Sequence, residues 1–170
     1  MKKKVVKIYN KGKNDLPQYK TDLSAGLDIK ADLSRVHSYS DIPSNIKVTY
    51  NDALEKVISV LPHGRVLIPT GLHVAIPDGY ELQIRPRSGI ALNNGVTLAN
   101  AIATIDSDYR GELGLIILNT DPNEVFEIRH GDRLAQGVLK EVEQIIWEEV
   151  SSIDELGSTD RGEGGFGHIT

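Results

Sequence analysis

The stretch Asn100-Ala-Ile-Ala-Thr-Ile-Asp106-Ser-Asp-Tyr109-Arg-Gly-Glu-Leu113 decides the fold class, because it joins two apolar runs through a short polar turn. Residues on both sides are apolar and β-prone, and Asp-Ser-Asp-Tyr-Arg-Gly between them is turn-forming. The pattern predicts a β-hairpin with carboxylates at its bend. Two surface aspartates in a loop would explain the same residues. However, Tyr109 places a flat ring three residues after Asp106, and the Asp106 carboxylate is a candidate base.

Short apolar runs separated by Gly, Pro, Asn or Asp extend over most of the chain, which is typical of an all-β protein. Prolines lie at the breaks, where a missing N–H does least harm. The predicted strands are Val5–Tyr9, Ala25–Ala31, Val57–Leu61, Val66–Leu72, Gly79–Ile84, Gly95–Ile105, Gly111–Asn119, Phe126–Ile128, Asp132–Val142 and Ile145–Val150.

One segment has two interpretations. Asp52-Ala-Leu-Glu55 has the pattern of a helix capping box, and the apolar residues that follow it would share one helical face. Val57–Leu61 is also a good strand before the Pro-His-Gly turn, and we favour the strand. Residues 34–51, rich in Ser, Asp and Tyr, we interpret as a surface excursion to which the sequence assigns no role.

Composition narrows the function classes. The chain has 170 residues and no shift in composition, so we expect one domain. It contains no cysteine, which excludes disulfides, a thiolate nucleophile and a cysteine zinc site. A formal charge of −5 argues against non-specific nucleic-acid binding, although a few arginines could still bind a small anion. Met1–Tyr9 is predicted to be a first strand, not a signal peptide or membrane span, which indicates a cytoplasmic protein.

Three further stretches carry candidate binding groups. Arg85-Pro-Arg-Ser-Gly89 places two arginines, a hydroxyl and a glycine within five residues, which suits a cluster of anionic oxygens; a solvated basic turn is the alternative. Ser24-Ala-Gly-Leu-Asp28 opens a strand with one acid among apolar residues. An ordinary sheet strand with no binding role is the alternative interpretation. Gly131-Asp-Arg-Leu-Ala-Gln136 begins a strand with a cation and an amide, predicted to lie on alternate sides.

The last ten residues differ in kind from the rest. Arg161-Gly-Glu-Gly-Gly-Phe166-Gly-His-Ile-Thr170 holds four glycines, one arginine and one aromatic ring. Such a tail should be flexible alone, because ordering costs about 1–2 kcal/mol per residue and little apolar surface offsets that. Its amides could contact phosphates while Arg161 supplies charge and Phe166 a stacking face. A tail that only aids solubility would not need Phe166.

Taken in order, these five stretches resemble the five motifs of the trimeric dUTPase family. The similarity covers nearly the whole chain apart from an insertion at about residues 34–55. It implies an all-β, jelly-roll-like (β-clip) domain over residues 1–160 and a Gly-rich tail over residues 161–170. It also implies a homotrimer with shared active sites, in which each tail closes over a neighbouring site. The implied reaction is Mg²⁺-dependent hydrolysis of dUTP to dUMP and pyrophosphate, which limits uracil in DNA and supplies dUMP for thymidylate synthesis.

The resemblance also implies roles for single residues. Those expected to act on the water and the phosphates are Asp106, which would orient the water, Ser88 at the α–β bridging oxygen, Arg87 and the Gly89 amide on phosphate, Gln136 at the α-phosphate, and Arg161 at the distal phosphates. Mg²⁺ would be held mainly by the triphosphate. For Asp28 two roles remain open: contact with the metal's water shell, or a structural role.

We expect the nucleoside to be bound mainly by the stretch Asn100–Leu113. The residues concerned are Asn100, Thr104 and Ile105 at the uracil edge, Gly114 allowing close backbone approach, Tyr109 flat on the sugar, and Phe166, followed by Gly167, stacking on the base. The family usually has Gly three residues before the catalytic Asp, whereas this chain has Ala103, so the uracil pocket should differ in detail.

Two alternatives remain. A dCTP deaminase or bifunctional deaminase–dUTPase on the same fold would release ammonia, but the complete Arg161–Gly167 motif argues against it. A dUTPase could also have a second, regulatory role, with the insertion at residues 34–55 binding a protein partner.

Overall fold

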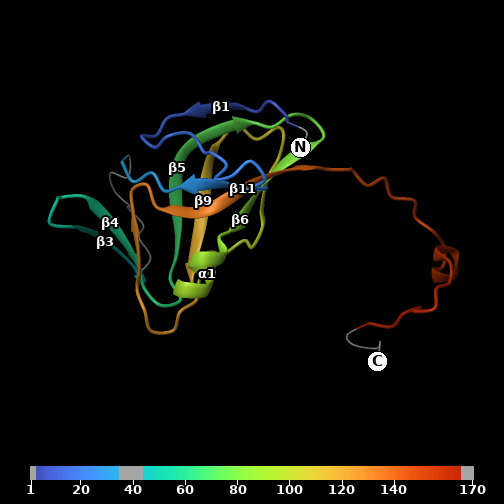
Figure 1. Cartoon of the computed structure of the whole chain (residues 1–170). Coiled ribbons are helices and arrows are strands. Elements are labelled where there is room, and N and C mark those ends of the chain that lie inside the picture. The colour runs from blue at the N-terminus through green and yellow to red at the C-terminus, as the bar shows by residue number, and fades with distance from the viewer. Residues whose placement is uncertain (1–2, 35–43, 166–170) are drawn as a thin grey trace.

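Three antiparallel β-sheets make up the computed structural model, which describes residues 3–34 and 44–165 (Figure 1). The strands are β1 (Lys7–Asn10), β2 (Leu27–Lys30), β3 (Ile46–Tyr50), β4 (Lys56–Val60), β5 (Arg65–Ala75), β6 (Tyr80–Pro86), β7 (Val96–Leu98), β8 (Ala103–Ile105), β9 (Glu112–Asn119), β10 (Phe126–Arg129) and β11 (Arg133–Glu141). The strand orders are β1-β5-β9-β7 in the first sheet, β2-β11-β6-β8 in the second and β10-β4-β3 in the third. The predicted all-β, jelly-roll-like fold is confirmed.

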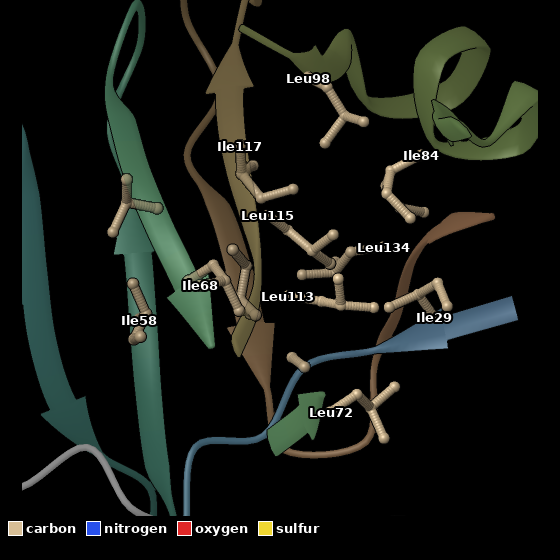
Figure 2. Packing of buried hydrophobic residues seen from close by; sticks show 14 of the residues in the cluster. Ile29, Ile58, Ile68, Leu72, Ile84, Leu98, Leu113, Leu115, Ile117 and Leu134 are labelled. Atoms are coloured by element: carbon tan, nitrogen blue, oxygen red, sulfur yellow. The ribbon is translucent and has the colours of Figure 1, made fainter. Parts of the chain in front are cut away.

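The core lies where the inner faces of the sheets meet (Figure 2). In β9 the burial alternates residue by residue, so Leu113, Leu115 and Ile117 are all buried. They pack with Ile29 and Ile84 of the second sheet in one apolar cluster. Each such side chain contributes roughly 1.5–3 kcal/mol by leaving water, so the period-two pattern of the chain holds the first two sheets together.

The predicted hairpin around Asp106 is wrong in its pairing. The expected strand Gly95–Ile105 is broken into β7 and β8 by a turn, in which Ala101 has φ +54° and donates its amide to the Leu98 carbonyl. β7 pairs with β9, whereas β8 pairs with β6 of the second sheet. The loop of residues 106–111 therefore crosses from one sheet to another.

Two short elements were not predicted. A helix α1 (Ser88–Asn94) follows the arginine motif, and seven residues are too few to show a helical period. It ends where Gly95 adopts the left-handed conformation, with φ +61°. A 3₁₀ helix occupies Ile153–Leu156. No helix in the described ranges is long and apolar enough to span a membrane.

The region of the predicted insertion is partly a hairpin. β3 pairs with β4, so residues 46–50, which we interpreted as surface excursion, are strand, while the strand favoured at Val57–Leu61 is confirmed as β4. Residues 35–43 lie outside the described part of the chain. The hairpin extends from the body of the sheets (Figure 1).

The strand predicted at Ile145–Val150 is absent. Beyond β11 the chain runs away from the sheets as an extended arm, and no strand formed by residues 3–34 or 44–165 lies beside it (Figure 1). The exposed fractions of Ile145, Ile146 and Trp147 are 69%, 95% and 84%. These residues are β-prone and apolar, but the described part of the chain offers the arm no strand to pair with.

A buried carboxylate fastens the end of β2 to the N-terminal loop. Asp32 Oδ2 accepts the Lys13 amide at 3.0 Å, and Oδ1 accepts the amide and hydroxyl of Ser34 at 2.9 and 2.5 Å. His130 Nδ1 lies 3.4 Å from Oδ1. Burial raises the pKa of Asp32, but the hydrogen bonds from Ser34 and Lys13, with the charge of His130, outweigh burial and hold the pKa below 3.8.

We expect Asp32→Ala to lower the free energy of unfolding by about 1–3 kcal/mol, because two part-buried backbone amides, those of Lys13 and Ser34, lose their acceptor. The folded pKa lies below the unfolded value of 3.8, so the ionised carboxylate stabilises the fold above that pH and this stabilisation is lost as pH falls through the folded pKa. Asp32→Asn should flatten that loss in urea unfolding measured from pH 6 down to pH 2. An unchanged acid dependence in Asp32→Asn would contradict this role.

Candidate active site

Polar side chains line one face of the second sheet. The strand register sets Asp28 of β2 opposite Gln136 of β11, and Gln136 opposite Arg85 of β6. In a neighbouring row, Gln83 of β6 lies opposite Thr104 of β8. Paired residues project to the same face, as do residues two apart on one strand. The register therefore brings three predicted site residues, Asp28, Thr104 and Gln136, onto one surface.

Gln83 and Arg85 of this surface were not predicted. Gln83 Oε1 accepts the Nε of Arg85 at 3.0 Å, and its Nε2 donates to Glu81 Oε1 at 2.7 Å. The signal for both was the alternation of polar residues with Leu82 and Ile84 along β6, which predicts a strand with one polar face. These hydrogen bonds form a polar ladder that connects the Gln136 row to the Thr104 row.

Ile105 projects to the opposite face. It pairs with Leu82 and packs against the hydrophobic core, so only its backbone groups are available to a ligand. Thr104 is exposed, and Asn100 is exposed in the turn before β8. Ala103 pairs with Ile84. Of the residues expected at the uracil edge, Thr104 and Asn100 therefore present side chains.

Asp28 binds two guanidinium groups. Arg87 Nε lies 2.9 Å from Oδ1 of Asp28, and Arg133 Nη1 lies 3.0 Å from Oδ2. Arg87 also donates Nη1 to the Arg133 carbonyl at 2.9 Å, and Gln136 donates Nε2 to the Pro86 carbonyl at 2.9 Å. Asp28 therefore holds two arginines beside Gln136, and contact of Asp28 with the metal's water shell stays a prediction.

The prediction that Arg133 and Gln136 lie on alternate sides is wrong. Arg133 pairs with Lys30 and Ala135 with Ile29, so β11 has one extra residue relative to β2. Such a bulge reverses the alternation of side chains. Arg133 therefore projects to the same face as Gln136, toward Asp28.

Ser88 and Gly89 open helix α1 and are both exposed. A β-carbon added at Gly89 would meet no described atom within 4 Å, so no contact within the described chain requires glycine there. By contrast, a β-carbon at Gly114 would collide with the Leu67 side chain. In this chain the close approach expected at Gly114 is made by Leu67 of β5.

The loop between β8 and β9 presents Asp106 and Tyr109, both exposed. The Tyr109 amide donates to the Asp106 carbonyl at 3.2 Å, which closes the turn, and the Tyr109 hydroxyl donates to the Glu112 carbonyl at 3.0 Å. The ring lies so close to Gly111 that a β-carbon at 111 would overlap it. The absence of a side chain at Gly111 therefore leaves room for the Tyr109 ring in this position.

The described part of the C-terminal motif, residues 161–165, lies on the arm that runs away from the sheets (Figure 1). There the Arg161 Nε donates to the Gly164 carbonyl at 2.6 Å. Phe166 and Gly167 lie outside the described residues. The strand register of one chain thus places Asp28, Gln136 and Thr104 on one face of the second sheet, and the loop that carries Asp106 follows β8 of that sheet, whereas Arg161 lies on the arm.

The model of the dUTPase family matches residues 46–170, which is more than half of the chain. The chain belongs to the dUTPase family. Two members of the family, each named deoxyuridine 5'-triphosphate nucleotidohydrolase, are 45% identical to it. That of Finegoldia magna aligns over 163 residues, 96% of both chains, and that of Fusobacterium nucleatum over 168 residues, 99% of this chain and 98% of the relative.

Solved dUTPases share the fold at lower identity. The dUTPase of Staphylococcus bacteriophage 80alpha, solved with dUPNHPP, has a TM-score of 0.75 at 20% identity and covers 99% of both chains. A mutant dUTPase from phage phi11 of S. aureus, described with a structural Mg(II) ion, has a TM-score of 0.67 at 19% identity. It covers 89% of this chain and 99% of its own. These likenesses place the chain in the dUTPase fold.

Proposed function

We propose that the protein hydrolyses dUTP to dUMP and pyrophosphate in the cytoplasm, with Mg²⁺, and so limits uracil in DNA while supplying dUMP for thymidylate synthesis. The observation that carries the proposal is the shared face of the second sheet, where Gln136 and Thr104 lie on one surface beside the Asp28–Arg87 pair. Two relatives at 45% identity over nearly the full chain bear the name of this activity.

In the proposed reaction Asp106 orients a water molecule for in-line attack on the α-phosphorus. The water loses a proton toward the Asp106 carboxylate, its oxygen bonds to phosphorus, and the bond from phosphorus to the α–β bridging oxygen breaks. Ser88 donates to that bridging oxygen, and pyrophosphate leaves. Asp106 and Ser88 are both exposed, as groups that receive a ligand must be.

The phosphate chain is bound by cations and amides. Arg87 and the Gly89 amide hold it, Gln136 contacts the α-phosphate, and Arg161 contacts the distal phosphates. Mg²⁺ would be bound mainly by phosphate oxygens, which are the hard oxygen ligands that this ion prefers. The ion would supply neutralisation of phosphate charge.

Uracil and deoxyribose are bound by the loop between β8 and β9 and by the residues next to it. Thr104, Asn100 and the backbone of Ile105 take the uracil edge, Ala103 shapes that pocket, and Tyr109 lies on the sugar. Phe166 of the tail stacks on the base, with Gly167 completing the tail. Gly114 has no side chain, so it allows a close approach to the backbone of β9 at this position.

The sugar contact gives a prediction at Tyr109. UTP should be a very poor substrate, because the ring leaves no room for a 2′-hydroxyl, and Tyr109→Ala should narrow the dUTP/UTP ratio of kcat/KM by about tenfold or more. Gly111→Ala is the matched variant, since it displaces the ring without removing it and should narrow the ratio in the same direction. An unchanged dUTP/UTP ratio in both variants would mean that another residue excludes the 2′-hydroxyl.

The arm supports a homotrimer with shared sites. Residues 141–156 carry six acidic and no basic side chains, and the apolar residues Ile145, Ile146 and Trp147 are exposed among them. β1 lies at an edge of the first sheet and carries Lys7, with Lys3 and Lys4 before it. An acidic, apolar arm from one copy fits such a basic edge on another. Residues 1–160 would then form the domain, and residues 161–170 would close over a neighbour's site.

A nucleotide panel tests the proposal. Pyrophosphate release is measured with dUTP, dCTP, dTTP and UTP, each with Mg²⁺ and with excess EDTA, and ammonia is measured with dCTP. We expect release from dUTP with Mg²⁺ to exceed the other nucleotides by at least about 10²-fold, and to collapse with EDTA. Ammonia from dCTP would favour the deaminase alternative, and equal use of dTTP would contradict a uracil pocket.

A further inference from the structure

The loop of residues 106–111 is closed by hydrogen bonds between its own residues. The Tyr109 amide donates to the Asp106 carbonyl at 3.2 Å. Arg110 Nη1 donates to the carbonyls of Ser107 and Tyr109 at 2.6 and 2.8 Å. These bonds make the loop one unit, in which the backbone around Asp106 is connected to Arg110. They do not hold that unit on the body of the protein, because each of them joins two residues of the loop.

His73 of β5 connects this loop to the first sheet. Its Nδ1 lies 3.0 Å from the carbonyl oxygen of Arg110. A carbonyl oxygen only accepts, so Nδ1 carries the hydrogen, as it does in one neutral tautomer of the ring and in the imidazolium. The imidazole can therefore donate to the loop in its neutral and in its charged form.

A bulge in β5 places His73 beside the end of the loop. β5 has three residues between Pro69 and His73, whereas β9 has one residue between their partners. The partner of His73 is Glu112, the first residue of β9. With regular pairing Gly71 would stand opposite Glu112, and this position would offer no side chain to the loop. The bulge therefore supplies a donor where the loop joins β9.

Neighbouring groups hold the bulge and the imidazole in place. Thr70 is buried, and its hydroxyl donates to a backbone carbonyl of β9 at 2.6 Å. The Gly71 amide donates to Glu112 Oε1 at 2.8 Å. On the other side of β5, Tyr9 of β1 pairs with His73, and the centroids of the two rings lie 5.8 Å apart. The imidazole is thus held by packing before it binds the loop, so its hydrogen bond to the loop costs little side-chain entropy.

We propose that His73 is a positioning residue, which holds the loop of Asp106 and Tyr109 on the first sheet through the Arg110 carbonyl. The effect on catalysis rests on the proposed function, because it requires Asp106 to orient the water. The connection between sheet and loop does not rest on it. A loop held in place keeps the Asp106 carboxylate aligned for the reaction, so loss of the hydrogen bond should act on turnover more than on substrate binding.

Two substitutions of His73 separate the hydrogen bond from the ring. His73→Asn keeps an N–H donor one bond from Cγ, as Nδ1 is, but removes the ring. His73→Phe keeps a ring against Tyr9 and removes the donor. We expect His73→Phe to lower kcat for dUTP about threefold to tenfold, the scale of one hydrogen bond, and to change KM less than about twofold. His73→Asn should retain at least about half of the kcat. Equal losses in the two variants, or wild-type kcat in His73→Phe, would overturn the proposal.

Hydrogen exchange reports on the loop without any need for activity. The amides of residues 106–111 should exchange about threefold to tenfold faster in His73→Phe, because the loop opens more often when it is not held. In His73→Asn the exchange should stay within about twofold of the wild-type rate. Buried residues of β9, such as Leu115, should keep their protection in both variants. Unchanged exchange of the loop in His73→Phe would contradict the role of His73.

The Asp106→Asn background tests whether His73 acts through the base. If His73 serves to position the carboxylate, His73→Phe should lower the residual kcat of Asp106→Asn less than about twofold. The same threefold to tenfold loss in both backgrounds would overturn the positioning role, since a general structural defect acts in either.

His63→Asn is the matched control. His63 is exposed in the turn before β5, and asparagine tolerates its left-handed φ of +58°. This variant should leave kcat and loop exchange unchanged. A loss as large as that of His73→Phe would show that the effect is not specific to the residue beside the loop.

The inference and the proposed function fail separately. If the protein does not hydrolyse dUTP but His73→Phe still accelerates exchange of the loop amides, the proposed function falls and the connection through His73 stands. If dUTP is hydrolysed and neither kcat nor loop exchange responds to His73→Phe, the inference falls and the proposed function stands.

Discussion

Asp106→Asn should lower turnover of dUTP about 10²–10⁴-fold while leaving nucleotide binding nearly intact. The amide keeps the size and hydrogen-bonding reach of the carboxylate, but it cannot accept a proton from the attacking water. The Asp106 side chain is exposed, so the fold should be unaffected. Steady-state pyrophosphate release measures turnover, and calorimetry with a non-hydrolysable dUTP analogue measures binding.

The neighbouring aspartate supplies the control. Asp108 is exposed in the same turn, two residues further on, and carries the same charge. Asp108→Asn should reduce turnover less than about threefold, because a carboxylate at that position is not assigned to the water. A large loss at Asp108 with near-normal turnover in Asp106→Asn would mean that the base is the other aspartate.

Deletion of residues 161–170 should abolish most turnover without destabilising the fold. In the described part of this segment, the Arg161 side chain bonds only to Gly164, so the free energy of unfolding should change by less than about 0.5 kcal/mol. Turnover should fall at least about 10²-fold, because closure brings Arg161 to the phosphates and excludes water. Full turnover in the truncated protein would leave the tail as a solubilising segment.

Mixing two inactive variants tests whether the tail acts on a neighbouring copy. Asp106→Asn and the truncated protein are unfolded together and refolded as mixed oligomers. Random assembly should give about one quarter of the wild-type turnover, because a site is complete when an intact Asp106 meets an intact tail from the next copy. Sites built within one chain would give no recovery.

Short apolar runs bounded by turn residues were enough to predict most strands of the domain. They identified β9 and β5, whose buried residues alternate with more exposed ones, and β4, where we favoured a strand over a helix. The strand at β11 was also predicted, but regular alternation could not show its bulge, because an extra residue depends on pairing with β2 rather than on local preference. For that reason Arg133 was predicted on the wrong side.

Pairing between distant strands was harder to predict. The apolar run before Asp106 fits one long strand as well as two short ones, and only its neighbours decide that β7 joins β9 while β8 joins β6. The segment Ile145–Val150 has strand residues but no partner strand among the residues that the structure describes. Its β-prone sequence is what we expect of a strand completed by another copy.

Hydrolysis of dUTP in water enriched in oxygen-18 tests the proposed chemistry most directly. If Asp106 directs water to the α-phosphorus, one labelled oxygen should appear in dUMP and none in pyrophosphate when the products are resolved by mass spectrometry. In Asp106→Asn, labelled dUMP should form at a rate reduced about 10²–10⁴-fold. Label in pyrophosphate, or products other than dUMP and pyrophosphate, would contradict attack at the α-phosphorus by a water that this loop positions.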